Sequence, residues 1–172
     1  MLQLLRTGKK NPKPGIIAPT KLNDRFEWFL EKATEIGIDE ISPIFCDHSE
    51  RRHIKAERME KVIVSAMKQS LKFNKPIFNE PLKFKDFLEK NEWDLGLIAH
   101  CEDSNKNDLG TLLPFDQKIM ILIGPEGDFS IDEIKKAIAT GIKPITFGES
   151  RLRTETAGIV ACNSVSLLNQ IM

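Results

Sequence analysis

The feature that most constrains this fold is a run of five apolar residues, Ile119–Ile123, followed at once by glycine and proline. An apolar run this short, ended by turn-forming residues, is typical of a strand buried in the middle of a sheet with both faces covered. From Ser130 onward the apolar residues recur with helical spacing instead. Strand and helix patterns alternate in this way along the chain, so the sequence predicts an α/β fold with a mostly parallel sheet flanked by helices.

The same two periodicities predict the other elements. We expect helices between residues 24 and 37, from 56 through 71, near 84–88, from 130 to 141, and after a cap at Thr154 or Thr156. We expect strands at residues 16–18, 41–45, 77–78, 95–99 and 144–147, and a polar loop at 102–108. Asp24 with Glu27, and Ser130 with Glu133, have the spacing of a capping box, in which each side chain accepts a hydrogen bond from a backbone N–H at the helix start.

Length and composition limit the class of protein. The 172 residues are 41% hydrophobic and 29% charged, which is ordinary for one soluble globular domain. No apolar run approaches the roughly twenty residues that cross a bilayer, and the start lacks a secretory signal, so we expect a cytoplasmic protein without a membrane partner. Cys46, Cys101 and Cys162 are widely spaced, which argues against a disulfide framework. Cys46 and His48 form only one candidate ligand pair, so we expect no metal.

The charged residues are sorted along the chain although the net charge is zero. Residues 1–25 and 48–75 each carry a net charge of +5, and residues 26–47 carry −5. Sorted basic segments can bind phosphate even in a neutral protein. Charge alone favours the simpler interpretation, which is a set of solvated faces.

Two glycine-bearing loops follow predicted strands. Gly124-Pro125-Glu126-Gly127 fits a turn with proline at its second position, in which the backbone can lie close to a ligand. It contains neither the dinucleotide fingerprint nor a phosphate-binding loop. Taken alone, it is equally consistent with a plain strand-to-helix turn.

The second loop, residues 147–158, brings charge to the start of the last helix. Arg151, Arg153 and Glu155 alternate with uncharged residues there. Loop arginines can bind an oxyanion in bidentate geometry, and the alternative is an Arg153–Glu155 surface pair of little energetic value. Ligands bind where the carboxyl ends of strands meet helix starts, so the two loops suggest one shared pocket.

Several ordered motifs resemble a known family. They are the stretches at 123–130 and 152–157, together with 24–37, 49–52 and 68–70. They resemble the RsmE family of ribosomal RNA uridine methyltransferases, in the SPOUT superfamily, from about Lys21 to the end of the chain. The resemblance implies a C-terminal trefoil knot, a homodimer, and S-adenosyl-L-methionine as cofactor. It also implies methylation of the imide nitrogen N3 of a uridine in small-subunit ribosomal RNA.

The resemblance also assigns residues to roles. Those implied to lie along the cofactor are His100, Ile123, Gly124, Glu126, Gly127, Leu152, Arg153, Thr154, Thr156 and Ala157. For His100, an ordinary half-buried position at the end of a strand is an equally good interpretation. Methyl transfer depends mainly on orientation, and a positive donor favours loss of the imide proton. Arg153 is the candidate donor, and Glu126, Glu155 or solvent is the candidate proton acceptor.

The candidate contacts for ribosomal RNA come from the basic segments: Arg25, Arg51, Arg52, Arg58 and Lys68. RsmE-like proteins carry an N-terminal PUA-like RNA-binding domain, and nothing of that size precedes Lys21. We therefore expect residues 1–20 to be a linker or a remnant of that domain, and residues 21–172 to be the methyltransferase domain. The rival interpretation is a non-catalytic RNA-binding or ribosome-assembly module that uses the basic segments. An ordinary α/β nucleotide-binding enzyme is disfavoured by the missing phosphate motifs.

Overall fold

A six-stranded sheet forms the centre of the computed structural model, in the order β1-β2-β9-β7-β10-β8. The structure describes residues 2–3, 16–17, 23–50, 53–90, 93–112 and 118–171. The sheet strands are β1 Leu2–Gln3, β2 Ile16–Ile17, β7 Leu95–Ala99, β8 Asn107–Asp108, β9 Ile119–Ile123 and β10 Lys143–Thr146. Every pairing is parallel except those of β1, which runs antiparallel to β2 and β9. The prediction of a mostly parallel sheet is confirmed.

The three central strands end at one level. Ala99, the last residue of β7, pairs with Ile123 of β9 on one side and with Ile145 of β10 on the other. Because these strands are parallel and in this register, the three segments that follow them emerge together at one edge of the sheet. That edge is where open α/β sheets bind ligands.

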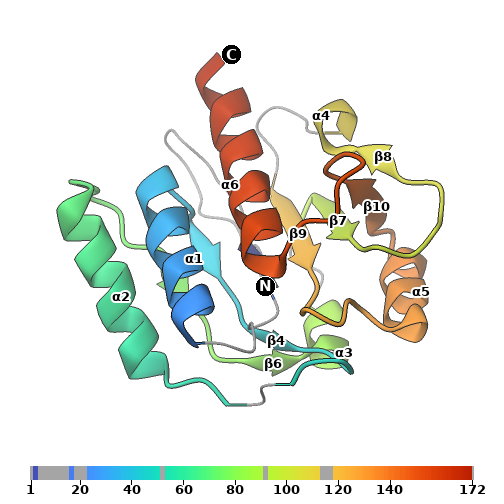
Figure 1. The fold of residues 1–172 in the computed structure, drawn as a ribbon, viewed down its shortest axis with the longest axis horizontal. Coiled ribbons are helices and arrows are strands. Elements are labelled where there is room, and N and C mark those ends of the chain that lie inside the picture. The colour runs from blue at the N-terminus through green and yellow to red at the C-terminus, as the bar shows by residue number, and fades with distance from the viewer. Residues whose placement is uncertain are drawn as a thin grey trace.

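Helices cover the sheet and its flanks (Figure 1). They are α1 Asn23–Ile36, α2 Ala56–Gln69, α3 Phe84–Leu88, α4 Leu109–Leu112, α5 Ile131–Ala139 and α6 Thr154–Ile171. Figure 1 shows α2, α1 and α6 side by side, with α1 in the middle, and α5 on the other side of the sheet beside β10. α2 is therefore the outermost of these three helices.

The core lies between the sheet and α1. All five residues of β9 are buried, as expected for a central strand covered on both faces. From α1, the helical spacing places Phe26, Phe29, Leu30 and Ala33 on one fully buried face. Burying an aliphatic or aromatic side chain of this size stabilises the fold by about 1.5–3 kcal/mol, so this face holds α1 on the sheet.

Two small parallel sheets lie beside the main one. β3 Glu40–Ile41 pairs with β5 Ile77–Phe78, and β4 Ile44–Phe45 pairs with β6 Leu82–Lys83. The single strand expected at residues 41–45 was therefore wrong. Ser42 and Pro43 interrupt it, because proline has no N–H to donate to a ladder.

Other boundaries differ from the expectation in small ways. α1 begins at Asn23, so Asp24 lies in its first turn and is not the cap. Glu27 bonds Arg58 of α2 instead of closing a capping box. The loop at 102–108 ends in the short strand β8. α6 starts at Thr154, so Thr154 is its first helical residue and Thr156 lies inside it, and neither residue is the cap.

The second capping box is confirmed. The Ser130 side chain accepts the Glu133 N–H, and the Glu133 carboxylate accepts the Ser130 N–H. Of residues 1–20, which we expected to be a linker or a domain remnant, the structure describes only Leu2–Gln3 and Ile16–Ile17, and both are strands of the main sheet.

Candidate functional site

The carboxyl ends of β7, β9 and β10 open into a cavity of about 730 Å³. Its walls are the segments that follow these three strands, at residues 100–106, 124–128 and 147–153, together with the start of α6 and Arg25 of α1. Both glycine-bearing loops thus line one cavity. The sequence predicted this meeting, and the level ends of the three parallel strands explain it.

Most of the proposed cofactor residues lie in the cavity wall. Those that do are His100, Ile123, Gly124, Glu126, Leu152, Arg153, Thr154 and Ala157. Gly127 and Thr156 were named with them, as was the catalytic candidate Glu155, but these three are not part of the wall. Further wall residues that the sequence analysis did not assign to the cofactor are Arg25, Ala99, Cys101, Asp103, Lys106, Pro125, Asp128 and residues 145–151.

Asp128 ties the first loop to the end of β7. Its Oδ2 accepts the Cys101 N–H at 2.6 Å, and its Oδ1 accepts the Phe129 N–H at 2.8 Å. Its backbone has φ 63°, which aspartate tolerates better than most residues. Its own N–H donates to the Pro125 carbonyl at 2.9 Å, which closes the turn. One carboxylate therefore sets the spacing between two walls of the cavity.

The two glycines of the first loop make room for protein neighbours. A Cβ on Gly124 would lie 3.0 Å from Asp128 Oδ1 and 3.1 Å from the ring of Phe129. A Cβ on Gly127 would lie 3.0 Å from the Cβ of His48. The His48 Nδ1–H donates to the carbonyls of Gly127 and Asp128 at 3.0 and 3.2 Å. Gly127 is thus small because the 46–49 loop packs on it.

The 46–49 loop is also fastened to the start of α5. The Asp47 N–H donates to Glu133 Oε1 at 3.0 Å, and the Ser130 hydroxyl donates to Asp47 Oδ2 at 2.7 Å. Burial raises the pKa of Glu133, although its bonds to the Ser130 and Asp47 N–H groups act in the opposite direction. The capping box of α5 therefore joins two loops as well as capping the start of a helix.

His100 is buried at the end of β7, in the cavity wall. It is 8% exposed, and neither ring nitrogen has a hydrogen-bond partner among the described residues. Burial lowers its pKa from 6.5, and the nearby Lys106 lowers it further, against the opposing effects of Asp128 and Glu102. The ring is therefore neutral near pH 7, with one donor and one acceptor nitrogen available to a ligand.

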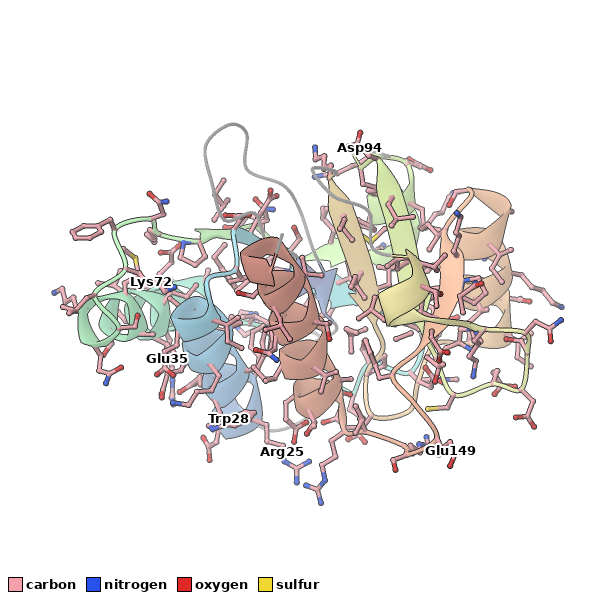
Figure 2. The ribbon with its side chains drawn as sticks, turned by 90° about the horizontal axis from the view of Figure 1, so that it is seen from above. Arg25, Trp28, Glu35, Lys72, Asp94 and Glu149 are labelled. Atoms are coloured by element: carbon pink, nitrogen blue, oxygen red, sulfur yellow. The ribbon has the colours of Figure 1, made fainter. Side chains whose placement is uncertain are left out.

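The second loop brings arginines to the cavity. Arg151 and Arg153 are exposed in its wall, and Figure 2 places Glu149 and Arg25 at the same end of the molecule. Glu155 is buried behind them and lies 3.7 Å from the Arg25 guanidinium, while its second carboxylate oxygen has no partner among the described residues. The suggested Arg153–Glu155 surface pair is therefore wrong, because Glu155 points toward α1.

The wall carries equal numbers of opposite charges. Its basic side chains are Arg25, Lys106, Arg151 and Arg153, and its acidic ones are Asp103, Glu126, Asp128 and Glu149. A site that bound only phosphate would be lined mainly by basic side chains. A cavity of mixed charge instead suits a ligand with groups of both signs.

The candidate RNA contacts are spread over the fold. Arg25 lines the cavity. Arg58 pairs with Glu27, 2.6 Å away, which raises the pKa of the guanidinium. Lys68 is exposed on α2. Arg51 and Arg52 lie outside the described residues.

Two other kinds of feature are absent from the described part of the chain. Among the described residues, no three side chains of histidine, cysteine, aspartate or glutamate cluster closely enough to hold a metal ion. No helix in the described ranges has the length and apolar character needed to cross a membrane.

Comparison with known proteins shows to which protein family the chain belongs. The model of the RNA methyltransferase domain family matches residues 11–166. Ribosomal RNA small subunit methyltransferase E of Rickettsia conorii is 32% identical over 148 residues, which cover 84% of this chain and 60% of that protein. The chain thus spans less than two thirds of that relative.

Two solved structures have the same fold. A probable rRNA-methyltransferase from Porphyromonas gingivalis is 41% identical, with a TM-score of 0.86 over 96% of this chain and 72% of that one. Ribosomal RNA small subunit methyltransferase E from Neisseria gonorrhoeae, bound to S-adenosyl methionine, is 26% identical, with a TM-score of 0.78 over 94% of this chain and 68% of that one. Because a family model covers most of the chain and relatives of one name match it along most of its length, the chain belongs to the ribosomal RNA small subunit methyltransferase E family.

Proposed function

We propose that this chain binds S-adenosyl-L-methionine in the cavity and methylates N3 of a uridine in small-subunit ribosomal RNA. The observation that carries the proposal is the meeting of both glycine-bearing loops around one cavity at the carboxyl ends of β7, β9 and β10. A family relative with this fold is described as bound to S-adenosyl methionine.

The residues present suit this cofactor. It carries a positive sulfonium, an ammonium and a carboxylate, and the wall offers side chains of both signs. The backbone of Ile123, Gly124 and Leu152 is available for polar contacts, and buried His100 has one donor and one acceptor nitrogen without a partner among the described residues. When bound, the cofactor supplies an electrophilic methyl group.

The chain itself would orient the base and stabilise its anion. The N3 imide must lose a proton before it can attack, and a nearby guanidinium favours that loss. Arg153 stands exposed at the cavity, so we assign it this role, with Glu126 in the same wall as the candidate proton acceptor. Glu155 is the weaker candidate, because it is buried against Arg25.

We further propose the SPOUT-type trefoil knot. In the sheet, β7 lies between β9 and β10, yet α6, which follows β10, packs on α1 and β9. The chain must therefore cross the end of β7 twice, once from β9 through α5 to β10 and once back toward α6 (Figure 1). Two such crossings over one strand are what a threaded C-terminal segment requires.

The remaining assignments follow from the same proposal. We propose that residues 21–172 form the methyltransferase domain, that it works as a homodimer without a metal, and that it acts in the cytoplasm, where ribosomal RNA is processed. The rival is a non-catalytic RNA-binding module. It predicts RNA binding that ignores the cofactor and any change at Gly124.

Calorimetry with S-adenosyl-L-methionine tests the first step. We expect saturable binding to the chain, which weakens when Gly124 is replaced by valine, because the new side chain would displace the ring of Phe129. Folded protein that gives no binding heat would refute the proposal. For the second step, Arg153→Ala should abolish transfer of a labelled methyl group to small ribosomal subunits while cofactor binding persists. Unchanged turnover would remove Arg153 from the mechanism.

A further inference from the structure

The turn after α2 presents apolar side chains to solvent. Phe73 is 98% exposed and Leu71 is 81% exposed, and exposed Lys72 lies between them. We call residues 70–75 the α2 tip. A single exposed apolar residue is common on proteins, but a phenylalanine with almost no protein contact contributes nothing to the core. Its presence must therefore be explained by something outside the described fold.

The backbone of the α2 tip points to the same conclusion. The Lys72 N–H donates to the Met67 carbonyl at 3.0 Å, and the Leu71 N–H approaches the Lys68 carbonyl at 3.5 Å, which is the hydrogen-bond pattern of a Schellman helix end. Leu71 occupies its left-handed position, with φ 55°. Glycine is favoured there because any Cβ adds strain. An exposed leucine at this position thus reduces stability without burying surface.

Basic side chains surround the α2 tip. Residues 61–79 contain four lysines and no acidic residue. Lys61 is paired with Glu57, and Lys75 with Glu60. Lys68 and Lys72 form no ion pair with a carboxylate of the described residues, and the Lys72 ammonium makes only a 3.5 Å bond to the Ile36 carbonyl. The carboxylate of Glu35, on the neighbouring end of α1, is occupied by Lys32. Lys72 in the tip and Lys68 in the last turn of α2 are therefore two cations that are available to a partner.

We propose that the α2 tip binds single-stranded RNA, with Phe73 stacking on a base and with Lys68 and Lys72 contacting phosphates. An exposed aromatic ring next to unpaired cations is the combination that proteins use for single strands, because every base has a face that can stack. This inference rests on the proposed RNA substrate. An apolar protein partner would fit Leu71 and Phe73 but would leave the two cations unexplained.

The α2 tip lies away from the cavity. α2 is the outermost of the helices α2, α1 and α6, and Figure 2 places Lys72 and Glu149 on opposite sides of the molecule. The nucleotides bound at the tip therefore do not include the one that is methylated at the cavity. The tip anchors a distant part of the substrate, so it contributes to RNA affinity and leaves the chemistry at the cavity unchanged.

The test is RNA binding by the whole chain, measured by fluorescence anisotropy with a labelled oligouridine of about 12 nucleotides, within the usual site size for such surfaces. Phe73→Ala should weaken binding by about 5-fold to 100-fold, which is the usual loss when one base loses its aromatic partner. Phe73→Trp should retain binding, and Phe73→Leu should not. Lys68→Gln with Lys72→Gln should flatten the dependence of log K on log salt by about 1.4.

A matched control separates stacking from general loss of apolar surface. Ile131 is 57% exposed on α5, on the other side of the sheet, and Ile131→Ala should leave RNA binding unchanged. Equal affinity for Phe73→Ala and the wild-type chain would overturn the inference. Full retention by Phe73→Leu would also overturn it, since the tip would then be an apolar docking site. So would a change of oligomeric state in Phe73→Ala, measured by sedimentation, because the tip would then contact a second copy.

The design distinguishes this inference from the proposed function. If the chain binds no S-adenosyl-L-methionine, the proposed function fails whatever happens at the tip. If the Phe73→Ala variant binds both the cofactor and the RNA as tightly as the wild-type chain does, only the inference fails. Leu71→Gly gives a further check on the backbone argument: relief of the left-handed strain should raise the urea midpoint. A lower midpoint would contradict the argument from backbone strain.

Discussion

Replacement of Asp128 offers the sharpest test of how the cavity is built. Asp128 holds the end of β7 and the turn after β9 through two backbone N–H groups, at 2.6 and 2.8 Å. A hydrogen bond to a charged group is worth about 1.5–3 kcal/mol. Cys101 is exposed, so its bond is weakened by water, and the bond to Phe129 is between neighbouring residues. We therefore take about 2 kcal/mol for the two bonds together, which is less than the sum of two full bonds.

Backbone conformation adds a second contribution. Asp128 has φ 63°, and an alanine there is disfavoured by about 1 kcal/mol. Asp128→Ala should therefore reduce the free energy of unfolding by about 3 kcal/mol, from both causes. Asp128→Gly removes the two hydrogen bonds but tolerates the positive φ, so we expect the free energy of unfolding to fall by about 2 kcal/mol. Asp128→Asn keeps one acceptor oxygen, and we expect about 1 kcal/mol.

The assay is urea unfolding followed by circular dichroism, with thermal unfolding as a check. For a chain of this length, about 3 kcal/mol corresponds to a fall in Tm of about 6–12 °C. Binding of S-adenosyl-L-methionine should weaken in the same order, because the two walls lose their fixed spacing. If Asp128→Gly is as stable as the wild-type chain, the carboxylate bonds contribute nothing and the reasoning is refuted.

Three further predictions concern other contacts of the site. The pKa of His100 is below 6.5 in the folded chain, so the unfolded chain binds a proton more readily there. The free energy of unfolding should therefore fall as pH drops below about 6.5. In urea unfolding at about pH 7.5 and about pH 5.5, the decrease in this free energy between the two pH values should be smaller for His100→Gln than for the wild-type chain. Ser130→Ala removes the α5 cap and the bond to Asp47 and should reduce stability by about 1–2 kcal/mol, whereas Ser130→Thr, which keeps the hydroxyl, should lose less. Gly127→Ala places a Cβ 3.0 Å from the His48 Cβ and should reduce the free energy of unfolding by about 1–3 kcal/mol. In a double-mutant cycle, a smaller loss in a His48→Gly background would confirm that contact, and an equal loss would exclude it.

The local patterns of the sequence predicted most elements correctly. Ile119–Ile123, Leu95–Ala99 and Phe84–Leu88 have the expected bounds, and the Ser130–Glu133 capping box is present. Each of these depends on periodicity or spacing within a few residues. One error arose where a distant partner competed with the local pattern. Glu27 has the spacing of a capping residue, but Arg58 from another helix takes its carboxylate.

The two loops were predicted to line one pocket because both follow parallel strands, and the ends of such strands meet at one edge of the sheet. Arg25 in the cavity wall was not predicted, since nothing in a helix sequence indicates what lies beside its first turn. Gly124 and Gly127 were predicted as places where a ligand could approach the backbone, and that prediction stays open. The structure adds that a side chain at either position would meet Phe129, Asp128 or His48.

By itself, the sequence determined the order of the longer strands and helices, the parallel character of the sheet and the loops that form the site, because these depend on short-range periodicity and turn chemistry. The short elements β1, β6, β8 and α4 were not predicted. Only the tertiary structure decided which groups face the cavity. His48 and Gly127 are 79 residues apart, and Asp47 and Glu133 are 86 apart, yet each pair is joined by a hydrogen bond. Contacts over such separations are set by how α1, the sheet and α5 pack together, and no pattern within one segment contains that information.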